Sequence, residues 1–436
     1  MEGGTRMKFI VTMRRAALLA AVLALAGCDL TESGGAGAAA AATARTVTPS
    51  PTALAQLGRQ LFFDPALSAS GRQSCATCHD PDHAYAPGNA LAAQLGGPAL
   101  SSPGLRTVPS LRYTLNRTPR WAKQFQANPL ERVTETDSVP TGGLTRDGRF
   151  NSLHEQATGP LLAANEMANP DPAAIVAKLK QASYAGEFRR LFGAAIFDHP
   201  EQAFGRMLDA LERFQLDDPS FHPYTSKFDQ HLQGKLELSA AEQRGLRLFT
   251  DASKGNCASC HIAAPGADGS PPLFTDFSFA NLGLPRNPRI AANADPRYYD
   301  LGLCGPERKD QAAMAGYCGM FKTPTLRNVA SRKVFMHNGV FTDLADAVRF
   351  YATRDSDPAR WYPRKAGRVQ RYNDLPPAMR ENVDVIDAPF NRPPGAKRVL
   401  SESEVQDIVQ FLRTLTDSDI RGPATTANIA IKANGG

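Results

Sequence analysis

Two Cys-x-x-Cys pairs, each followed at once by a histidine, carry the strongest chemical signal in this chain. The motifs consist of Cys75, Cys78 and His79, and of Cys257, Cys260 and His261. Cys-x-x-Cys-His is the attachment signature of a c-type haem, in which the thiols bond to the porphyrin edge and the adjacent imidazole binds the iron. A zinc site of four thiolates is the competing chemistry, but it leaves both histidines unexplained. We therefore expect two covalently bound haems c.

Two further cysteines, Cys304 and Cys318, are separated by a stretch rich in Gly, Lys, Asp and Ala. In an oxidising compartment such a pair forms a structural disulfide, worth about 3 kcal/mol in the chain-entropy model. Metal binding by these two residues alone is not expected.

The segments that lead into the two motifs are similar. Residues 58–64 read Gly-Arg-Gln-Leu-Phe-Phe-Asp and residues 245–251 read Gly-Leu-Arg-Leu-Phe-Thr-Asp, and the two motif histidines are 182 positions apart. Each segment is typical of the end of a helix followed by a short loop. The chain is therefore expected to consist of two similar halves, 53–225 and 226–420, with a tail at 421–436.

Two capping boxes mark helix starts in the second half. Ser239 with Glu242 begins the helix before the second motif, and Ser401 with Glu404 begins a final helix. The final helix has an apolar face, which we expect to pack in the second half.

The N-terminus is typical of an exported protein. In residues 1–27, four basic side chains precede an apolar run that is too short to span a bilayer. The run ends in Leu-Ala-Gly-Cys, which resembles a lipobox and predicts cleavage before a lipidated Cys28; a plain signal peptide is the alternative. Asp29 resembles an inner-membrane retention signal, and residues 28–52 are predicted to be a flexible tether. We expect a periplasmic protein with a lipid anchor as its only membrane attachment.

The composition argues against a disordered chain and against a nucleic-acid-binding protein. The chain has 436 residues, 42% hydrophobic and 21% charged, which indicates a globular protein. A net charge of +6, without a basic run, does not support nucleic-acid binding.

The motifs together resemble those of the bacterial di-haem cytochrome c peroxidases and the related MauG enzymes, from about residue 57 to residue 415. The matching segments are Leu61-Phe62-Phe63-Asp64-Pro65, Asp147-Gly148-Arg149, Glu155-Gln156-Ala157, Asn165-Glu166-Met167, Pro324-Thr325-Leu326-Arg327-Asn328-Val329, His337-Asn338-Gly339 and Val348-Arg349-Phe350-Tyr351. The resemblance implies a mostly α fold of two cytochrome c-like domains whose haems face the domain interface. It also implies that hydrogen peroxide reacts at the His79 haem and that the His261 haem relays or stores electrons.

The sequence departs from the conventional peroxidases at the axial positions. Their second histidine, sixteen residues after the first haem histidine, is replaced by Leu95, which implies an open first haem. Their methionine, fourteen residues after the His-x-Gly histidine, is replaced by Tyr351, as in MauG. A phenolate favours higher oxidation states of iron than a thioether does. A core tyrosine is the plain alternative for Tyr351, and Met336 is a rival ligand.

The resemblance also implies a peroxide-side pocket formed by Gln156 and Glu166, with Pro160 shaping it. General acid–base work on peroxide needs a group that moves the proton and a polar group that holds the leaving oxygen. From the residues alone, a surface glutamine and a glutamate at a helix start would be the preferred interpretation. Gly159 and Pro160 are expected to end the helix that carries Gln156.

Arg146 stands where the family usually has a tryptophan between the haems. A guanidinium cannot be oxidised as an indole can, so we expect Arg146 to pair with haem propionates instead. A tyrosine ligand with this arginine is similar to the BthA-type branch of the family. The positions that match the family's calcium site are Thr107, Arg332 and Val334, and a nearby cation makes calcium doubtful.

The predicted function is that of a MauG-like di-haem peroxidase, which reacts with hydrogen peroxide and forms high-valent haem for oxidation of a donor or a protein substrate. The alternatives are a conventional cytochrome c peroxidase, supplied with electrons by a small periplasmic cytochrome, and a non-enzymatic di-haem electron carrier.

Overall fold

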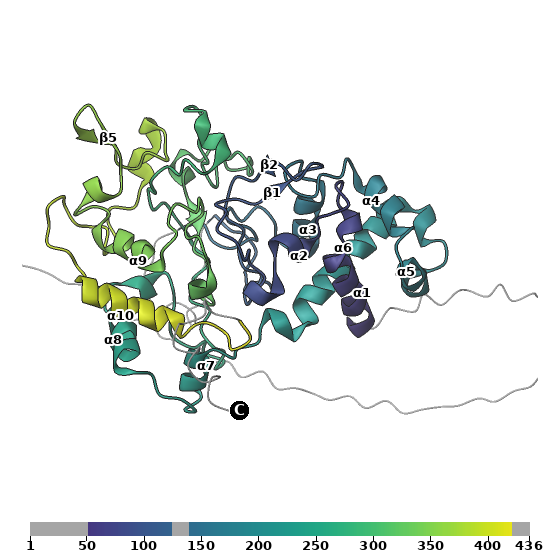
Figure 1. Ribbon diagram of the computed structural model, residues 1–436, viewed down its shortest axis with the longest axis horizontal. Helices are drawn as coiled ribbons and strands as arrows, with labels where there is room; N and C mark the ends of the chain where they lie inside the picture. Colours follow the sequence, from purple (N-terminus) through teal and green to yellow (C-terminus); the bar gives the residue numbers. More distant parts are fainter. Residues whose placement is uncertain (1–50, 124–138, 421–436) are drawn as a thin grey trace, which may run out of the picture. The chain divides into compact units, whose positions relative to one another are not determined.

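Helices and long loops make up most of the computed structural model, which describes residues 51–123 and 139–420 (Figure 1). The predicted signal sequence, the C-terminal tail and all of the tether except residues 51 and 52 lie outside these ranges. The helices are α1 (Pro51–Phe63), α2 (Cys75–Cys78), α3 (Leu153–Leu162), α4 (Pro172–Leu179), α5 (Ala185–Phe192), α6 (Pro200–Asp217), α7 (Lys227–Leu232), α8 (Ala240–Thr250), α9 (Leu344–Thr353) and α10 (Glu402–Arg413). None of the helices in the described residues is long and apolar enough to cross a membrane.

Strands are short in the described part of the chain and form antiparallel pairs. The pairs are β1 (Leu95–Gly96) with β2 (Ser102–Pro103), β3 (Phe279–Ala280) with β4 (Phe321–Lys322), and β5 (Arg364–Lys365) with β6 (Arg368–Val369). The fold is thus mostly α, as expected.

The first half is organised by the packing of α1 against α6. Leu57 and Leu61 of α1 are buried in one cluster with Leu211 and Phe214 of α6. Gly58 lies at the point of closest approach, where a Cβ atom would overlap the carbonyl oxygen of Ala210. Only glycine lets the two helices come this close, which fixes the end of α1 just before the first haem motif.

The second half repeats this arrangement with α8 and α10, which lie side by side in Figure 1. A Cβ atom at Gly245 would overlap the carbonyl oxygen of Asp407 in α10. Both predicted capping boxes are confirmed, since Ser239 and Ser401 each accept a hydrogen bond from the backbone N–H three residues on. The expected apolar face of α10 is buried, and it includes Ile408.

Two separate hydrophobic clusters support the two halves. The first contains buried residues between Leu57 and Phe221, and the second contains buried residues between Phe228 and Leu415. The predicted boundary between residues 225 and 226 falls between them, although the domain limits themselves remain a prediction. Buried Arg112 links the halves, with Nη1 2.9 Å from Oδ2 of Asp417.

One local prediction was wrong. We expected Gly159 and Pro160 to end the helix that carries Gln156, but α3 continues to Leu162. Proline removes a single hydrogen bond inside the helix. The last turn keeps the bond from the Ala163 N–H to the Gly159 carbonyl, at 2.9 Å, and Leu161 is buried in the first cluster, so the helix persists.

Candidate haem-binding site

One continuous cavity of about 510 Å³ contains the chemistry of both halves. Both haem motifs line it, and so do the residues expected on the opposite faces of the haems. The predicted site residues on its wall are Cys75, Cys78, His79, Arg146, Gln156, Pro160, Glu166, Cys257, Cys260, His261 and Tyr351. The fold therefore brings together every residue that the sequence singled out as part of the site.

The two motif histidines are oriented in the same way. Nδ1 of His79 lies 3.0 Å from the carbonyl oxygen of Tyr85, and Nδ1 of His261 lies 2.8 Å from that of Phe274. When Nδ1–H donates this bond, Nε2 carries the lone pair that a metal needs. Both acceptor residues have positive φ angles, +53° at Tyr85 and +54° at Phe274, which bulky residues rarely adopt. The same unusual backbone thus occurs at the same position in both halves.

Burial keeps these imidazoles neutral. It lowers the pKa of His79 to about 4, with Arg332 adding to the effect and the Tyr85 carbonyl opposing it. Burial also lowers the pKa of His261. A neutral imidazole is the form that binds iron.

The cysteine pairs fit thioether attachment. Cys75, Cys78, Cys257 and Cys260 are free thiols in the structure, and burial raises the pKa of each. They are thus protonated, partly buried thiols on the cavity wall beside the motif histidines, rather than thiolates. By contrast, Cys304 and Cys318 form the expected disulfide.

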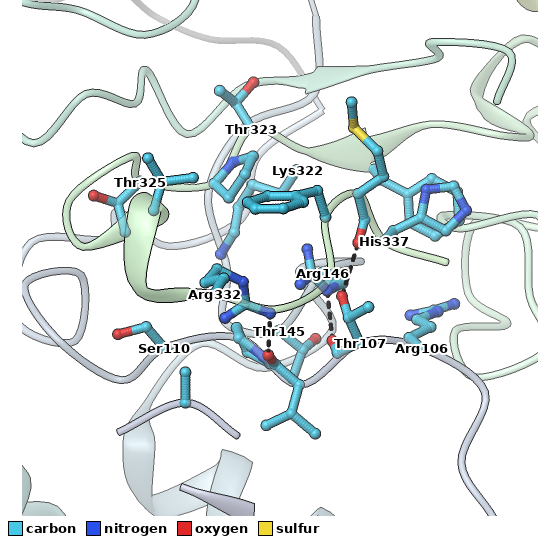
Figure 2. Close-up of a pocket in the computed structure, with 18 of the residues that line it drawn as sticks. Arg106, Thr107, Ser110, Thr145, Arg146, Lys322, Thr323, Thr325, Arg332 and His337 are labelled. Carbon is cyan, nitrogen blue, oxygen red and sulfur yellow. Dashed lines mark hydrogen bonds between the residues drawn. The ribbon is translucent and has the colours of Figure 1, made fainter. Parts of the chain in front are cut away.

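A group of cations lies on the wall of the same cavity (Figure 2). Arg146, Lys322 and Arg332 are partly buried, and none of them forms an ion pair with a carboxylate in residues 51–123 and 139–420. Their hydrogen bonds go to backbone oxygens: Arg146 to Thr107 at 2.7 Å, Arg332 to Val108 at 2.8 Å, and Lys322 to Gly143.

Each of these cations has a lowered pKa, because it is desolvated and has no carboxylate bound to it. Burial, together with Arg332 and Arg106, lowers the pKa of Arg146 to about 9. Burial lowers the pKa of Arg332 to about 10 and that of Lys322 to about 7. Buried cations of this kind need anions, and two haems would bring four propionates. The thiols, imidazoles and cations together fit two haems c.

Tyr351 reaches the cavity from α9 on the side of the second motif. Burial and then the thiols of Cys260 and Cys257 raise the pKa of its phenol, which places the hydroxyl near this pair. The phenol is therefore neutral at ordinary pH in this environment. Met336, the rival ligand, also lines the cavity.

The peroxide-side residues lie around α3. Gln156 and Pro160, four residues apart, share one face of this helix and line the cavity. A turn then folds back, with the Met167 N–H donating to the Pro160 carbonyl at 3.0 Å, and this turn places Glu166 on the cavity wall. Glu166 as a residue is exposed at the cavity wall, and partial burial of its carboxyl raises the pKa of that group.

Sequence reasoning missed several charged residues of the cavity, namely Arg106, Lys322 and Glu307. All three line it. Lys322 directly precedes the segment Thr323-Pro324-Thr325-Leu326-Arg327, and Val108-Pro109-Ser110-Leu111-Arg112 is its counterpart in the first half. Aligning the two halves over this second repeat would have drawn attention to these segments.

Covalent c-type attachment at two similar sites in a mostly helical chain defines a di-haem cytochrome c-type protein. A family model described as di-haem cytochrome c peroxidase matches residues 52–237. MauG of Paracoccus denitrificans is 34% identical over 85% of this chain and 90% of its own length. The chain belongs to the family of di-haem cytochrome c peroxidases and MauG proteins.

Two further relatives agree. The cytochrome c551 peroxidase of Nitrosomonas europaea is 28% identical over 85% of this chain and 82% of its own length. The crystal structure of the di-haem peroxidase BthA from Burkholderia thailandensis is similar with a TM-score of 0.76 and 39% identity, over 86% of this chain and 89% of that one. The chain is a peroxidase-type oxidoreductase with two cytochrome c-like domains and two c-type haems, and hydrogen peroxide is the substrate that this class implies.

Proposed function

We propose that this chain is a MauG-like peroxidase in which hydrogen peroxide binds beside Glu166, on the side of the cavity served by His79. The observation that supports it best is that Glu166, Gln156 and both motif histidines line one cavity. A haem held by Cys75, Cys78 and His79 supplies the redox chemistry of the peroxide bond. The side chains around it supply proton transfer and orientation.

Glu166 is the proton-transferring group in this proposal. Burial raises the pKa of its carboxyl above the usual value, so it exchanges protons closer to neutral pH. With the haem bound, Glu166 would accept a proton from one oxygen of the peroxide and return it to the other oxygen, which leaves as water. Gln156 donates a hydrogen bond to that departing oxygen, and Pro160 limits the space beside it.

The second site would supply charge storage. His261 and Tyr351 both line the cavity and would bind the iron of the second haem, while Cys257 and Cys260 would hold its porphyrin. An anionic phenolate stabilises the oxidised metal, which suits charge storage better than routine electron transfer. Arg146, Lys322 and Arg332, which line the cavity, would bind the haem propionates.

The final electron source is a periplasmic donor. The resemblance to the MauG enzymes favours oxidation of another protein, and the relative named cytochrome c551 peroxidase favours a small cytochrome as the alternative donor. We further propose domain limits at residues 53–225 and 226–420 and attachment to the inner membrane through a lipid on Cys28.

Spectroscopy of the purified holoprotein tests this function. One high-spin and one low-spin ferric haem are expected, with rapid spectral changes on adding hydrogen peroxide. Glu166→Gln is expected to slow that reaction by about 10²-fold or more, while Glu155→Gln, an exposed neighbour on α3, leaves it unchanged. Two low-spin haems that do not respond to peroxide would instead identify an electron carrier.

A further inference from the structure

A carboxylate from the second half lies at the peroxide-side pocket of the first half. Oε2 of Glu307 is 3.1 Å from Nη2 of Arg149, the arginine of the Asp147-Gly148-Arg149 motif. Both side chains line the haem cavity, and they are only partly exposed, at 36% for Glu307 and 23% for Arg149. This ion pair therefore joins the two halves at the cavity wall.

The loop that carries Glu307 is anchored at several points. The disulfide between Cys304 and Cys318 closes it. Next to Glu307, the buried guanidinium of Arg308 donates to the carbonyl oxygen of Asp147 at 2.8 Å and lies 4.0 Å from the ring centroid of Trp121. These contacts tie the loop directly to the segment that contains Arg149, so Glu307 is held in place.

Two carboxylates, those of Asp147 and Glu307, bind the guanidinium of Arg149. Nη1 lies 2.9 Å from Oδ2 of the fully buried Asp147, and Nη2 lies against Glu307. Asp147 is in turn bound by Arg106 at 2.6 Å, and Arg106 holds both carboxylate oxygens of Asp300 at 2.6 and 2.7 Å. The result is a chain of alternating charges that runs across the two halves and fixes the guanidinium of Arg149.

Glu166 lies within the electrostatic reach of this pair. Arg149 lowers the pKa of Glu166 and Glu307 raises it, while burial is the largest influence and raises it. Glu166 also interacts with the thiols of Cys75 and Cys78, which can no longer ionise once they form thioethers. In the holoprotein, Arg149 and Glu307 are therefore the charged side chains that act on Glu166 with opposite sign.

We propose that Glu307 is a positioning residue which the second half contributes to the peroxide-side pocket: by binding Arg149, it withholds that positive charge from Glu166. This inference rests on the proposed role of Glu166 as the proton-transferring group. The second half would then act on the peroxide reaction directly, in addition to carrying the second haem.

Removal of the negative charge at residue 307 should lower the pKa of Glu166. Without it, the full charge of Arg149 acts on Glu166, which then ionises at lower pH. Since the ionised carboxylate accepts the peroxide proton, the acid limb of the rate profile should move to lower pH by about 0.5–1 unit in Glu307→Gln. Arg149→Gln should move it in the opposite direction.

The experiment measures the bimolecular rate constant of the holoprotein with hydrogen peroxide as a function of pH. Asp310→Asn is the matched control, because it removes one negative charge from the same disulfide loop. The double variant Cys304→Ser/Cys318→Ser, which frees the loop, is a second route to the same displacement and is expected to shift the limb to lower pH as well.

Infrared difference spectroscopy supplies a readout independent of turnover. The carbonyl band of protonated Glu166, assigned by its loss in Glu166→Gln, is followed through a pH titration in each variant. A midpoint lowered in Glu307→Gln but not in Asp310→Asn supports the inference, and a midpoint that is unchanged or raised in Glu307→Gln overturns it. Normal peroxide reactivity of Glu166→Gln would refute the proposed function, while the infrared titration would still decide the role of Glu307.

Discussion

Nε of Arg146 donates a hydrogen bond of 2.7 Å to the backbone carbonyl oxygen of Thr107. The next carbonyl, that of Val108, accepts a bond of 2.8 Å from Arg332. Arg146 thus occupies the backbone oxygen of Thr107, and Arg332 occupies that of the next residue. Thr107 and Arg332 are two of the positions that the family resemblance associates with calcium. A divalent cation at this place would lie close to two buried positive charges.

Chelation is therefore expected to have no effect. After dialysis against excess EGTA, the holoprotein should keep its peroxide reaction rate and its midpoint of thermal unfolding, because the arginines already satisfy these oxygens. Metal analysis of the purified protein and calorimetry with and without the chelator provide the check. A stoichiometric calcium ion whose removal lowers the melting temperature would contradict the prediction.

Leu95 in β1 lines the cavity where the conventional family members have a ligand histidine. Leu95→His should let an imidazole close the open face of the first haem, converting it from high spin to low spin. Electron paramagnetic resonance and the visible spectrum report the spin state, and the peroxide rate should fall by about 10-fold or more. Leu95→Gln, which adds polarity without a strong ligand, should remain high spin.

If Tyr351 is the ligand proposed above, Tyr351→Met exchanges an oxyanionic ligand for a neutral thioether. The reduction potential of the second haem should rise by about 100 mV or more, because a thioether favours the ferrous state. A spectroelectrochemical titration measures the change, and Tyr351→Phe separates loss of the ligand from gain of sulfur. An unchanged potential and unchanged ferric spectrum in both variants would point to Met336 as the ligand.

In the helix pair α1 and α6, alanine substitution of two glycines is expected to have opposite effects on the stability of the protein. Gly58→Ala should destabilise the protein by about 2 kcal/mol or more, because its Cβ would overlap the Ala210 carbonyl. Gly205, in α6, has open space at the corresponding atom, and Gly205→Ala should stabilise it by about 0.5–1 kcal/mol. Urea unfolding followed by far-ultraviolet circular dichroism compares the two variants.

Asp374 makes stability depend on pH. Burial raises its pKa from 3.8 to about 7, although Asn338 and Arg286 oppose this. The folded state therefore holds a proton that the unfolded state has released, so stability is lost as the pH rises from about 4 through 7. The loss is at most about 4 kcal/mol.

Asp374→Asn removes this dependence. Relative to the parent protein, the variant should gain stability between pH 5 and pH 8, as measured by denaturant unfolding at the two values. A relative stability that falls over this range would show that Asp374 is ionised and well paired in the native protein.

The sequence by itself determined the chemistry of attachment and most of the local structure. Cys-x-x-Cys-His is a contiguous motif, so neighbouring residues alone predict a haem near His79 and another near His261. The capping boxes at Ser239 and Ser401 are equally local, and both were confirmed. Local signals failed at Pro160, where packing of Leu161 and the remaining hydrogen bonds carry α3 past the proline.

Only the tertiary structure decided which distant residues share the cavity. Arg149 and Glu307 are 3.1 Å apart although they lie in different halves of the sequence. Arg146, Lys322 and Arg332 likewise come together from separate positions in the chain. Such contacts depend on how the two halves pack, which no local pattern encodes. The role of a buried charge cannot be predicted until its neighbours in space are known. These neighbours decide whether the charge is paired within the protein or free to bind a cofactor.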